Sequence, residues 1–452
     1  MKVKKLLVAA LMLVAAVSYG QTYSPNVITT GVPFVSINPD SRGGAMGDCG
    51  VATSADIYSM HYNPAKYVYL EDKFAGGLGY SPWLRNLVSD MGLAYLALGY
   101  KINDRSAVAG TLRYFSPGKI EFRDQYNQSL GEYTPNEWAI DATYSRMLGD
   151  YLSGAVAGRF IYSNLIQNQS DYARPGISVA ADVAVYYKRP VEWFSNMDAD
   201  FSWGAAITNI GSKITYNASS NRRDFIPTTL RLGTGLRLEL DEYNSLAFTV
   251  DFTKLMVPTP PIIARDDNGN PLYNDDGTYK IQYGMDNNVS VVQGMIQSFY
   301  DAPGYSYNAN NHDLVHVGSF YEELCEINIG AGVEYWYNNI FAVRGGYFNE
   351  TAMKGNRKYV TLGAALKYNV FGLDVSSRSK RSRRAALCFS ASRPRAALPP
   401  SRAAGSLPKE SLASLRYLHQ NCSSPCASRE SMGWAKMPSV RFAAPKTAAA
   451  AV

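Results

Sequence analysis

The sequence predicts an all-β protein that crosses a membrane as an antiparallel β-barrel. Three observations predict this fold: an N-terminal export signal, a long series of strands with period-two alternation, and connections that alternate between short and long. A barrel is the expected form because an exported chain without a long apolar helix can pair all its backbone polar groups in lipid only by closing a sheet.

The chain begins with a signal peptide, predicted over residues 1–20. Three lysines lie within the first five residues, an apolar run extends from Leu6 to about Val17, and small residues lead to Gly20. The apolar run is too short for a membrane-spanning helix, and no later segment reaches 18 uninterrupted apolar residues. We therefore expect an exported protein without helical membrane spans.

Period-two alternation dominates the chain from Lys73 to Ser376. In "TTLRLGTGLRLEL" the leucines share one face, while Arg231, Gly233 and Glu239 take the other. Twelve full strands are predicted, near residues 73–81, 90–102, 105–115, 136–148, 151–164, 176–188, 200–210, 228–240, 244–254, 327–337, 340–349 and 357–368. A thirteenth begins at Val370.

The predicted connections alternate in length along the chain. Short turns such as "NDR", "LGD" and "LDEY" alternate with long loops, the longest of which extends from about Leu255 to Glu326. Outer-membrane barrels have short periplasmic turns and long extracellular loops. Many of the 33 tyrosines lie near strand ends, where their rings suit the headgroup level of the membrane.

The C-terminal segment differs in composition from the rest of the chain. Residues 377–452 contain 14 Lys and Arg against two acids, a net charge of +12, whereas the region between signal and tail carries about −9. The segment shows no periodicity, so we expect residues 377–452 to be a basic disordered tail, with a frameshifted or fused end as one origin. We expect no nucleic-acid partner for an exported chain, despite this charge.

Motifs for catalysis or metal binding are not found in the predicted barrel. Cys49 and Cys325 are too few for a disulfide framework, and "HDLVH" (His312 to His316) lacks the glutamate of a metalloprotease helix. Glu322 and Glu323 in "SFYEELCE" are expected on the solvated face of a loop helix. In the tail, His419, Cys422 and Cys426 only loosely resemble metal-ligand spacing. We predict a non-enzyme without cofactor or metal.

Four long segments resemble the PorV family, also called LptO. They are "SINPDSRGGAMGDCGVATSADIYSMHYNPAK", "SFYDAPG", "YEELCEINIGAGVEYWYNNIFAVRGGYFNE" and "KGNRKYVTLGAALKYNVFGLDVS". The resemblance covers about Tyr23 to Ser376. It implies a FadL-like barrel of about 14 strands over residues 73–376, with residues 21–72 as a plug in the lumen.

The resemblance also implies a function in the type IX secretion system of Bacteroidota. Members of the family bind the C-terminal signal domains of cargo proteins. They collect cargo at a SprA-type translocon and pass it to a PorU-type sortase complex that attaches it to lipopolysaccharide. We therefore expect an integral outer-membrane protein, surrounded by lipid and lipopolysaccharide, with loops on the cell surface.

Two sets of residues are candidates for function. Apolar side chains in predicted loops suggest docking of a partner, with local packing of the loops as the alternative: Trp83, Leu84, Leu87, Val291, Met295, Ile296 and Phe299. Small and turn-forming residues on the periplasmic side of the first strand suggest a plug packed in the lumen, with a flexible leader as the alternative: Gly43, Gly44, Gly47, Cys49, Gly50, Asn63 and Pro64.

The sequence departs from the family pattern after "FGLDVS". The rest of strand thirteen and the whole of strand fourteen are replaced by the basic tail, so the last strands are expected to be missing and the barrel to assemble poorly. Two other functions stay open: a FadL-like transporter of hydrophobic small molecules, and a protein for lipopolysaccharide modification by O-deacylation.

Overall fold

The computed structural model describes residues 24–83, 90–123, 128–165, 173–194, 197–219, 223–266, 269–308, 314–380 and 382–392. The chain divides into two units, Met1–Ala397 and Leu398–Val452. All described residues belong to the first unit. The predicted signal peptide and residues 393–452 of the predicted tail lie outside the described residues.

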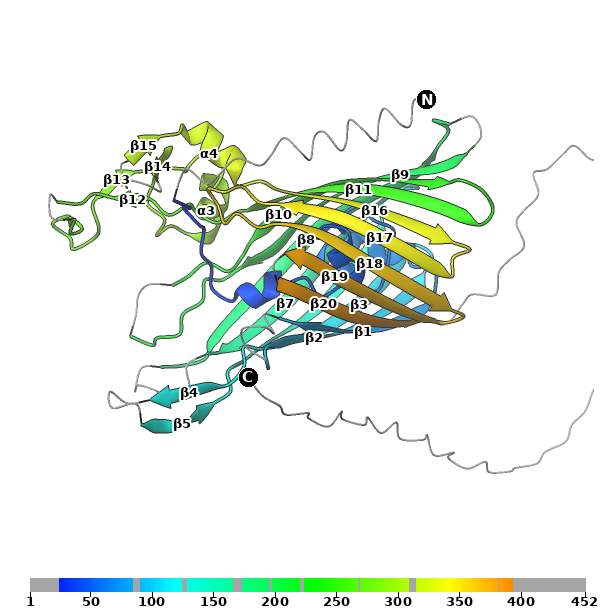
Figure 1. The fold of residues 1–452 in the computed structure, drawn as a ribbon, viewed down its shortest axis with the longest axis horizontal. Coiled ribbons are helices and arrows are strands. Elements are labelled where there is room, and N and C mark those ends of the chain that lie inside the picture. The colour runs from blue at the N-terminus through cyan, green and yellow to red at the C-terminus, as the bar shows by residue number, and fades with distance from the viewer. Residues whose placement is uncertain are drawn as a thin grey trace, which may run out of the picture. The chain divides into compact units, whose positions relative to one another are not determined.

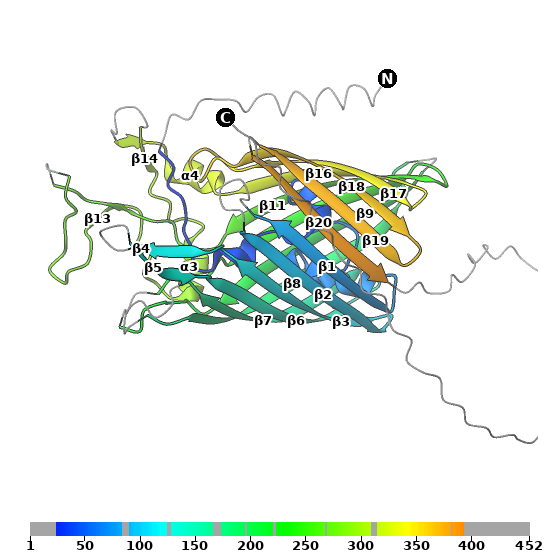
Figure 2. The ribbon, with the colours of Figure 1, turned by 60° about the horizontal axis from the view of Figure 1, so that its bottom comes forward.

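Fourteen antiparallel strands of the described chain form a closed barrel (Figures 1 and 2). Neighbouring strands follow the chain order, and three small hairpins, β4–β5, β12–β13 and β14–β15, lie in the connections. The barrel strands are β1 (Phe74–Pro82), β2 (Gly92–Asn103), β3 (Ser106–Ser116), β6 (Asn136–Met147), β7 (Leu152–Asn164), β8 (Gly176–Val191), β9 (Asp198–Gly211), β10 (Thr229–Glu239), β11 (Asn244–Leu255), β16 (Asn328–Tyr337), β17 (Phe341–Asn349), β18 (Lys358–Tyr368), β19 (Phe371–Lys380) and β20 (Ser382–Ser392).

The predicted all-β barrel is confirmed, and each of the twelve predicted strands has an observed counterpart. The period-two pattern arises because one face of each strand meets lipid and the other meets the lumen. On β3, Leu112 and Tyr114 are exposed on the outer face, whereas Thr111 and Arg113 are buried on the inner face. Polar and small residues therefore line the interior.

The expectation that the last strands are missing is wrong. β20 pairs with β19 from Phe371↔Ala391 to Lys380↔Ser382, and it pairs with β1 from Ala75↔Ser392 to Tyr80↔Leu387. Residues 377–380 and 382–392 are therefore part of the barrel wall and not of a disordered tail. The physical reason is that an edge strand in lipid would leave a row of backbone groups unpaired, a cost that outweighs the basic composition.

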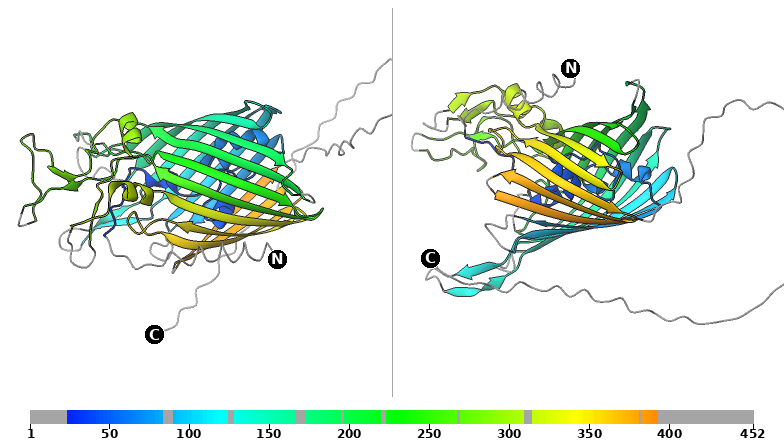
Figure 3. Two further views of the ribbon diagram at one scale, coloured as in Figure 1. Left: turned by 90° about the horizontal axis from the view of Figure 1, so that it is seen from above. Right: turned by 45° about the vertical axis from the view of Figure 1, so that its right-hand side comes forward.

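The long connections gather at one end of the barrel (Figures 1 and 3). There lie the hairpins β4 (Ile120–Arg123) with β5 (Ser129–Tyr133), β12 (Ile262–Ile263) with β13 (Ile281–Tyr283), and β14 (Tyr305–Tyr307) with β15 (Leu314–His316), together with helices α3 (Val291–Gln297) and α4 (Ser319–Cys325). Within the described ranges, no helix has both the length and the apolar character to span a bilayer.

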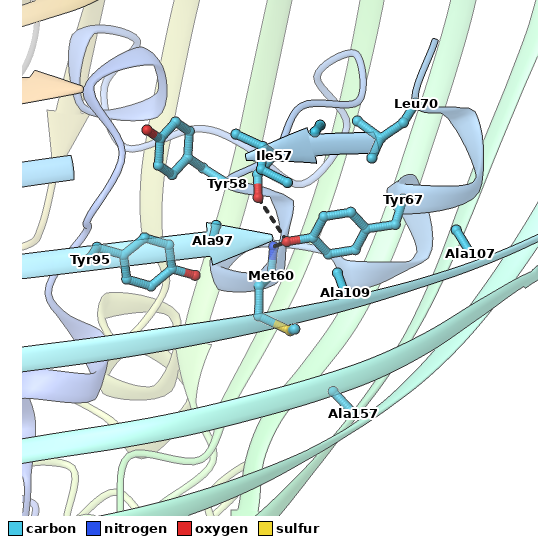
Figure 4. Packing of buried hydrophobic residues seen from close by; sticks show 11 residues of the cluster. Ile57, Tyr58, Met60, Tyr67, Leu70, Tyr95, Ala97, Ala107, Ala109 and Ala157 are labelled. Atoms are coloured by element: carbon cyan, nitrogen blue, oxygen red, sulfur yellow. Dashed lines mark hydrogen bonds between the residues drawn. The ribbon is translucent and has the colours of Figure 1, made fainter. Parts of the chain in front are cut away.

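The segment before β1 fills the lumen, so the predicted plug is confirmed (Figure 2). It contains the short helices η1 (Pro33–Ser36), α2 (Ser41–Ala45), η2 (Ser59–His61) and η3 (Pro64–Tyr69). In one buried cluster, Met60 and Tyr67 of the plug pack against wall alanines such as Ala107 and Ala109 (Figure 4). The Tyr67 hydroxyl donates to the Ile57 carbonyl at 2.9 Å and accepts from the Met60 amide at 3.1 Å.

Candidate functional site: the lumen plug and the outer loops

The predicted plug glycines lie where the plug touches the wall or itself most closely. Gly47 has a positive φ of 71°, and a Cβ atom there would lie 2.5 Å from the carbonyl oxygen of Tyr347. On the wall side, a Cβ atom on Gly346 would lie 2.2 Å from the Gly47 nitrogen. Two backbones therefore meet at a distance that only glycine permits.

Two other predicted glycines, Gly43 and Gly50, make room for an aromatic ring. A Cβ atom on Gly43 would lie 2.3 Å from the Tyr62 hydroxyl, and one on Gly50 would lie 2.2 Å from the Tyr62 ring. At Gly44 it would approach Ser376 of β19 to 3.4 Å. The small residues thus allow a short segment to fit inside a wall of fixed diameter.

Asn63, Pro64 and Cys49 also lie in the plug. Pro64 opens η3, and Asn63 is its N-cap, with the side-chain oxygen Oδ1 accepting from the Ala65 amide at 3.0 Å. The Asn63 side-chain amide donates to the carbonyl of Val185 on β8 at 2.9 Å. Cys49 is fully buried and has a free thiol.

Buried ion pairs join the plug to the barrel wall. Arg42 donates to Glu334 of β16 at 2.6 Å and forms an ion pair with Asp56 at 3.0 Å. Glu334 also pairs with Arg344 of β17 at 2.6 Å. Asp48 of the plug accepts from Arg378 of β19, also at 2.6 Å, in a further ion pair. These contacts fix residues 42–56 to the wall. A flexible leader would lack such contacts.

A second apolar cluster lies in the lumen near the end of the barrel that carries the long loops. Phe34 and Val35 of η1 pack there with wall residues that include Phe115 and Ile161. Trp83, one of the predicted docking residues, is half-buried and packs against this cluster. The two other candidates in that connection, Leu84 and Leu87, lie outside the described residues.

Asp40 gives the plug a pH dependence. Its carboxylate caps α2 by accepting from the Arg42 and Gly43 amides, and burial together with the nearby Asp56 charge raises its pKa from 3.8 to about 7. The folded protein therefore keeps this proton between about pH 4 and pH 7 while the unfolded chain loses it, and stability falls as pH rises through that window.

In Asp40→Asn, which keeps a capping side chain, the free energy of unfolding measured with urea from pH 4.5 to 8 should show a flatter pH dependence. An unchanged slope would contradict this assignment.

The described residues of the connection between β11 and β16, 256–266, 269–308 and 314–327, form the second site, here called the loop platform. The sequence predicted that Glu322 and Glu323 lie on the solvated face of a loop helix, and this prediction is wrong. In helix α4 both glutamates are buried. Lys254, at the end of β11, pairs with Glu323 at 3.1 Å and with Glu326 at 2.5 Å. Lys354 pairs with Glu322 at 2.7 Å. Two lysines from the barrel wall and its β17–β18 loop thus neutralise the buried acids.

The turn after α3 is held to α4 by the same carboxylates. Glu323 accepts from the Ala302 amide at 2.9 Å, and Glu322 accepts from the Gly304 amide at 2.8 Å. Asp301 accepts from the Thr259 amide at 3.1 Å, and burial raises the pKa of Asp301 to about 6. The two helices are therefore one packed unit.

Both helices expose apolar side chains, and α4 does so because its acids face inward. The exposed residues, here called the apolar patch, are Val292, Ile296, Phe299, Tyr300, Phe320, Tyr321 and Leu324. Phe320 is 78% exposed and Val292 is 66% exposed. Of the predicted docking residues, Ile296 and Phe299 belong to the patch, whereas Val291 and Met295 are half-buried. The α4 residues were not predicted, because the sequence indicated that its acids face solvent.

A closed barrel with a polar inner face, an apolar outer face and long loops at one end defines an integral outer-membrane protein. The family model described as the type IX secretion system protein PorV matches residues 20–262, more than half of the chain. The chain therefore belongs to the PorV family, and it is an outer-membrane protein of type IX secretion. The PorV family is a family of secretion-system proteins.

Comparisons with solved structures find other barrels at low similarity. The toluene transporter TodX of Pseudomonas putida aligns with a TM-score of 0.43 and 9% identity over 78% of this chain and 98% of its own. A FadL homologue of Pseudomonas aeruginosa aligns at 0.34 and 10% over 82% and 98%. LpxR of Salmonella typhimurium aligns at 0.28 and 7% over 70% and 98%. Likenesses at these scores carry no inference about function. No curated protein matches the chain.

Proposed function

We propose that this barrel is a cargo carrier of type IX secretion. Its loop platform binds the C-terminal signal domains of cargo proteins as they leave a SprA-type translocon. The barrel then presents them to a PorU-type attachment complex at the cell surface. Family membership supports the secretion role, and the apolar patch supports a binding role for the platform.

The inverted burial of α4 is the observation that carries the proposal. The helix buries Glu322 and Glu323 and exposes Phe320, Tyr321 and Leu324. Exposing aromatic side chains while burying acids is costly for an isolated helix in water. Exposed large apolar side chains gathered on two short loop helices are typical of a binding site for another protein. The barrel supplies a rigid base on which such a loop can be held.

The lumen supports a carrier better than a transporter of hydrophobic molecules. Such a transporter needs an apolar path from the loops into the lumen. Here Phe34 and Val35 pack with wall residues in an apolar cluster, and a buried ion pair joins Arg42 of the plug to Glu334 of the wall. A path through the barrel would require breaking these pairs in a medium of low dielectric constant.

The double variant Ile296→Asp with Phe320→Asp should lower the recovery of cargo signal domains with the purified barrel by about tenfold or more. Apolar anchors of an interface commonly contribute about 2 kcal/mol or more each, and about 1.4 kcal/mol corresponds to tenfold in affinity. The measurement is affinity purification from outer membranes with the co-purified domains quantified by mass spectrometry.

The matched control combines Leu272→Asp with Tyr273→Asp, which adds the same charge at exposed positions of the loop platform outside the patch. Heat-modifiable migration on gels reports whether each variant assembles. Recovery of cargo that stays normal in an assembled double variant would refute binding at the apolar patch. Equal losses in the double variant and the control would place binding elsewhere on the platform.

A further inference from the structure

The described chain begins among the outer loops, at the far end of the barrel from the start of β1 (Figure 1). The Ser24 amide donates to the Tyr307 carbonyl at 2.7 Å, and the Ser306 hydroxyl donates to the Ser24 carbonyl at 3.0 Å. Ser24 thus lies beside β14, whose other edge pairs with β15. The segment was expected on the periplasmic side, but its beginning reaches the opposite end.

Asn26 connects three parts of the outer end that are far apart in sequence. Its side-chain amide donates to the carbonyl of Pro260 at 3.2 Å and to the carboxylate of Glu322 on α4 at 3.4 Å. Its backbone amide donates to the carbonyl of Met353, in the β17–β18 connection, at 2.8 Å. One residue of the N-terminal segment therefore joins the start of the loop platform, its α4 helix and a neighbouring loop.

The segment then enters the lumen near α3, where it contacts Phe225. The Gly31 amide donates to the Phe225 carbonyl at 2.8 Å. α3 rests on the ring of the same residue, since a Cβ atom on Gly294 would lie 2.8 Å from it. Residues 24–31 contact α4 directly through Asn26, reach α3 indirectly through Phe225, and continue into the plug.

We propose that residues 24–31 form a strap that completes the loop platform, so that the partner-binding surface forms only after this strap has reached the outer end of the barrel. The binding role of the platform rests on the proposed function, whereas the position of the strap does not. An exported chain is in the periplasm before its barrel forms. The strap must therefore reach the outer end during assembly, either along the lumen or before the barrel closes around it.

The first experiment tests the location of the strap. Pro25→Cys places a thiol at an exposed strap position, and Glu242→Cys places one in an exposed short turn at the other end of the barrel. Intact cells are treated with a membrane-impermeant maleimide, with the parent protein giving the background of the native cysteines. We expect Pro25→Cys to react on intact cells and Glu242→Cys to react only after the outer membrane is permeabilised. Protection of Pro25→Cys until permeabilisation would overturn the proposal.

The second experiment tests whether the strap holds the platform. Asn26→Ala removes the side-chain bonds to Pro260 and Glu322. We expect limited proteolysis within residues 298–327 to become about tenfold faster, as for loss of a hydrogen bond to a buried carboxylate. Asn26→Asp should have a larger effect, because it places a second negative charge beside Glu322. Asn288→Ala is the control, as its side chain is exposed on the same platform.

The outcomes separate the strap from the proposed function. Unchanged proteolysis in both Asn26 variants would overturn the strap, whatever happens to cargo. Faster proteolysis with lower cargo recovery supports both proposals. Faster proteolysis with normal cargo recovery supports the strap as a structural element and contradicts cargo binding on the platform. Heat-modifiable migration confirms in each case that the barrel itself has assembled.

Discussion

Replacing Glu334 with glutamine should lower the free energy of unfolding by about 3 kcal/mol. Glu334 is 2% exposed and accepts from two arginines, Arg42 of the plug and Arg344 of β17. Breaking a buried ion pair from one side commonly costs about 3–5 kcal/mol, because a charge is left without its partner. The lower end of this range is expected here, since Asp56 still pairs with Arg42 and Asp374 with Arg344.

Urea unfolding of the purified barrel in lipid vesicles, followed by tryptophan fluorescence, measures this effect. Glu239→Gln serves as the control: its ion pair with Arg237 has a similar length, 2.7 Å, but its side chain is 45% exposed. Such an exposed pair contributes less than about 1 kcal/mol. If the two variants lost the same amount of stability, the plug–wall ion pairs would not hold the plug in the way the structure indicates.

Truncation after Lys380 should abolish assembly of the barrel, whereas truncation after Ser392 should leave assembly unchanged. The first removes β20 and exposes the edges of β1 and β19, which are paired with it over six and ten residue pairs. Unpaired backbone groups in lipid cost several kcal/mol each. The second truncation removes only residues outside the described part of the chain.

Heat-modifiable migration and protease resistance in outer membranes distinguish the two truncations. Normal assembly of the protein that ends at Lys380 would mean that residues 382–392 do not contribute to the wall, and the original expectation of a barrel without them would stand. Failure of both proteins would show that residues after Ser392 are needed for assembly.

The strands of this fold were predictable because the residue pattern of each strand depends on the surroundings of its own two faces. A residue such as Leu112, which meets lipid, alternates with one such as Arg113, which meets the lumen, and this pattern is local in sequence. The glycine-rich stretch before β1 was also informative, since a plug inside a narrow wall requires small residues. The last strand was missed because its basic composition resembles that of a solvated tail. Its pairing with β1 joins the first and last strands of the barrel, which are far apart in sequence.

The site was predictable only in part. The apolar residues Ile296 and Phe299 in a loop indicated an exposed patch, and they are exposed. The orientation of α4 could not be inferred, because its acids are neutralised by Lys254, about 70 positions earlier, and by Lys354, about 30 later. A short helix with acids and aromatics on opposite faces fits either orientation until its partners are known. Nor did the sequence reveal which end of the lumen the N-terminus reaches.

The closed ring and the segment inside it impose an order on folding. The plug is joined directly to β1, and the ring closes through the pairing of β1 with β20, the first and last strands of the barrel. Once this seam forms, the enclosed segment has lost its sideways exit. The plug must therefore enter before the seam closes or thread through an end. The six-pair seam, shorter than the nine pairs between β1 and β2, is where we expect unfolding to start.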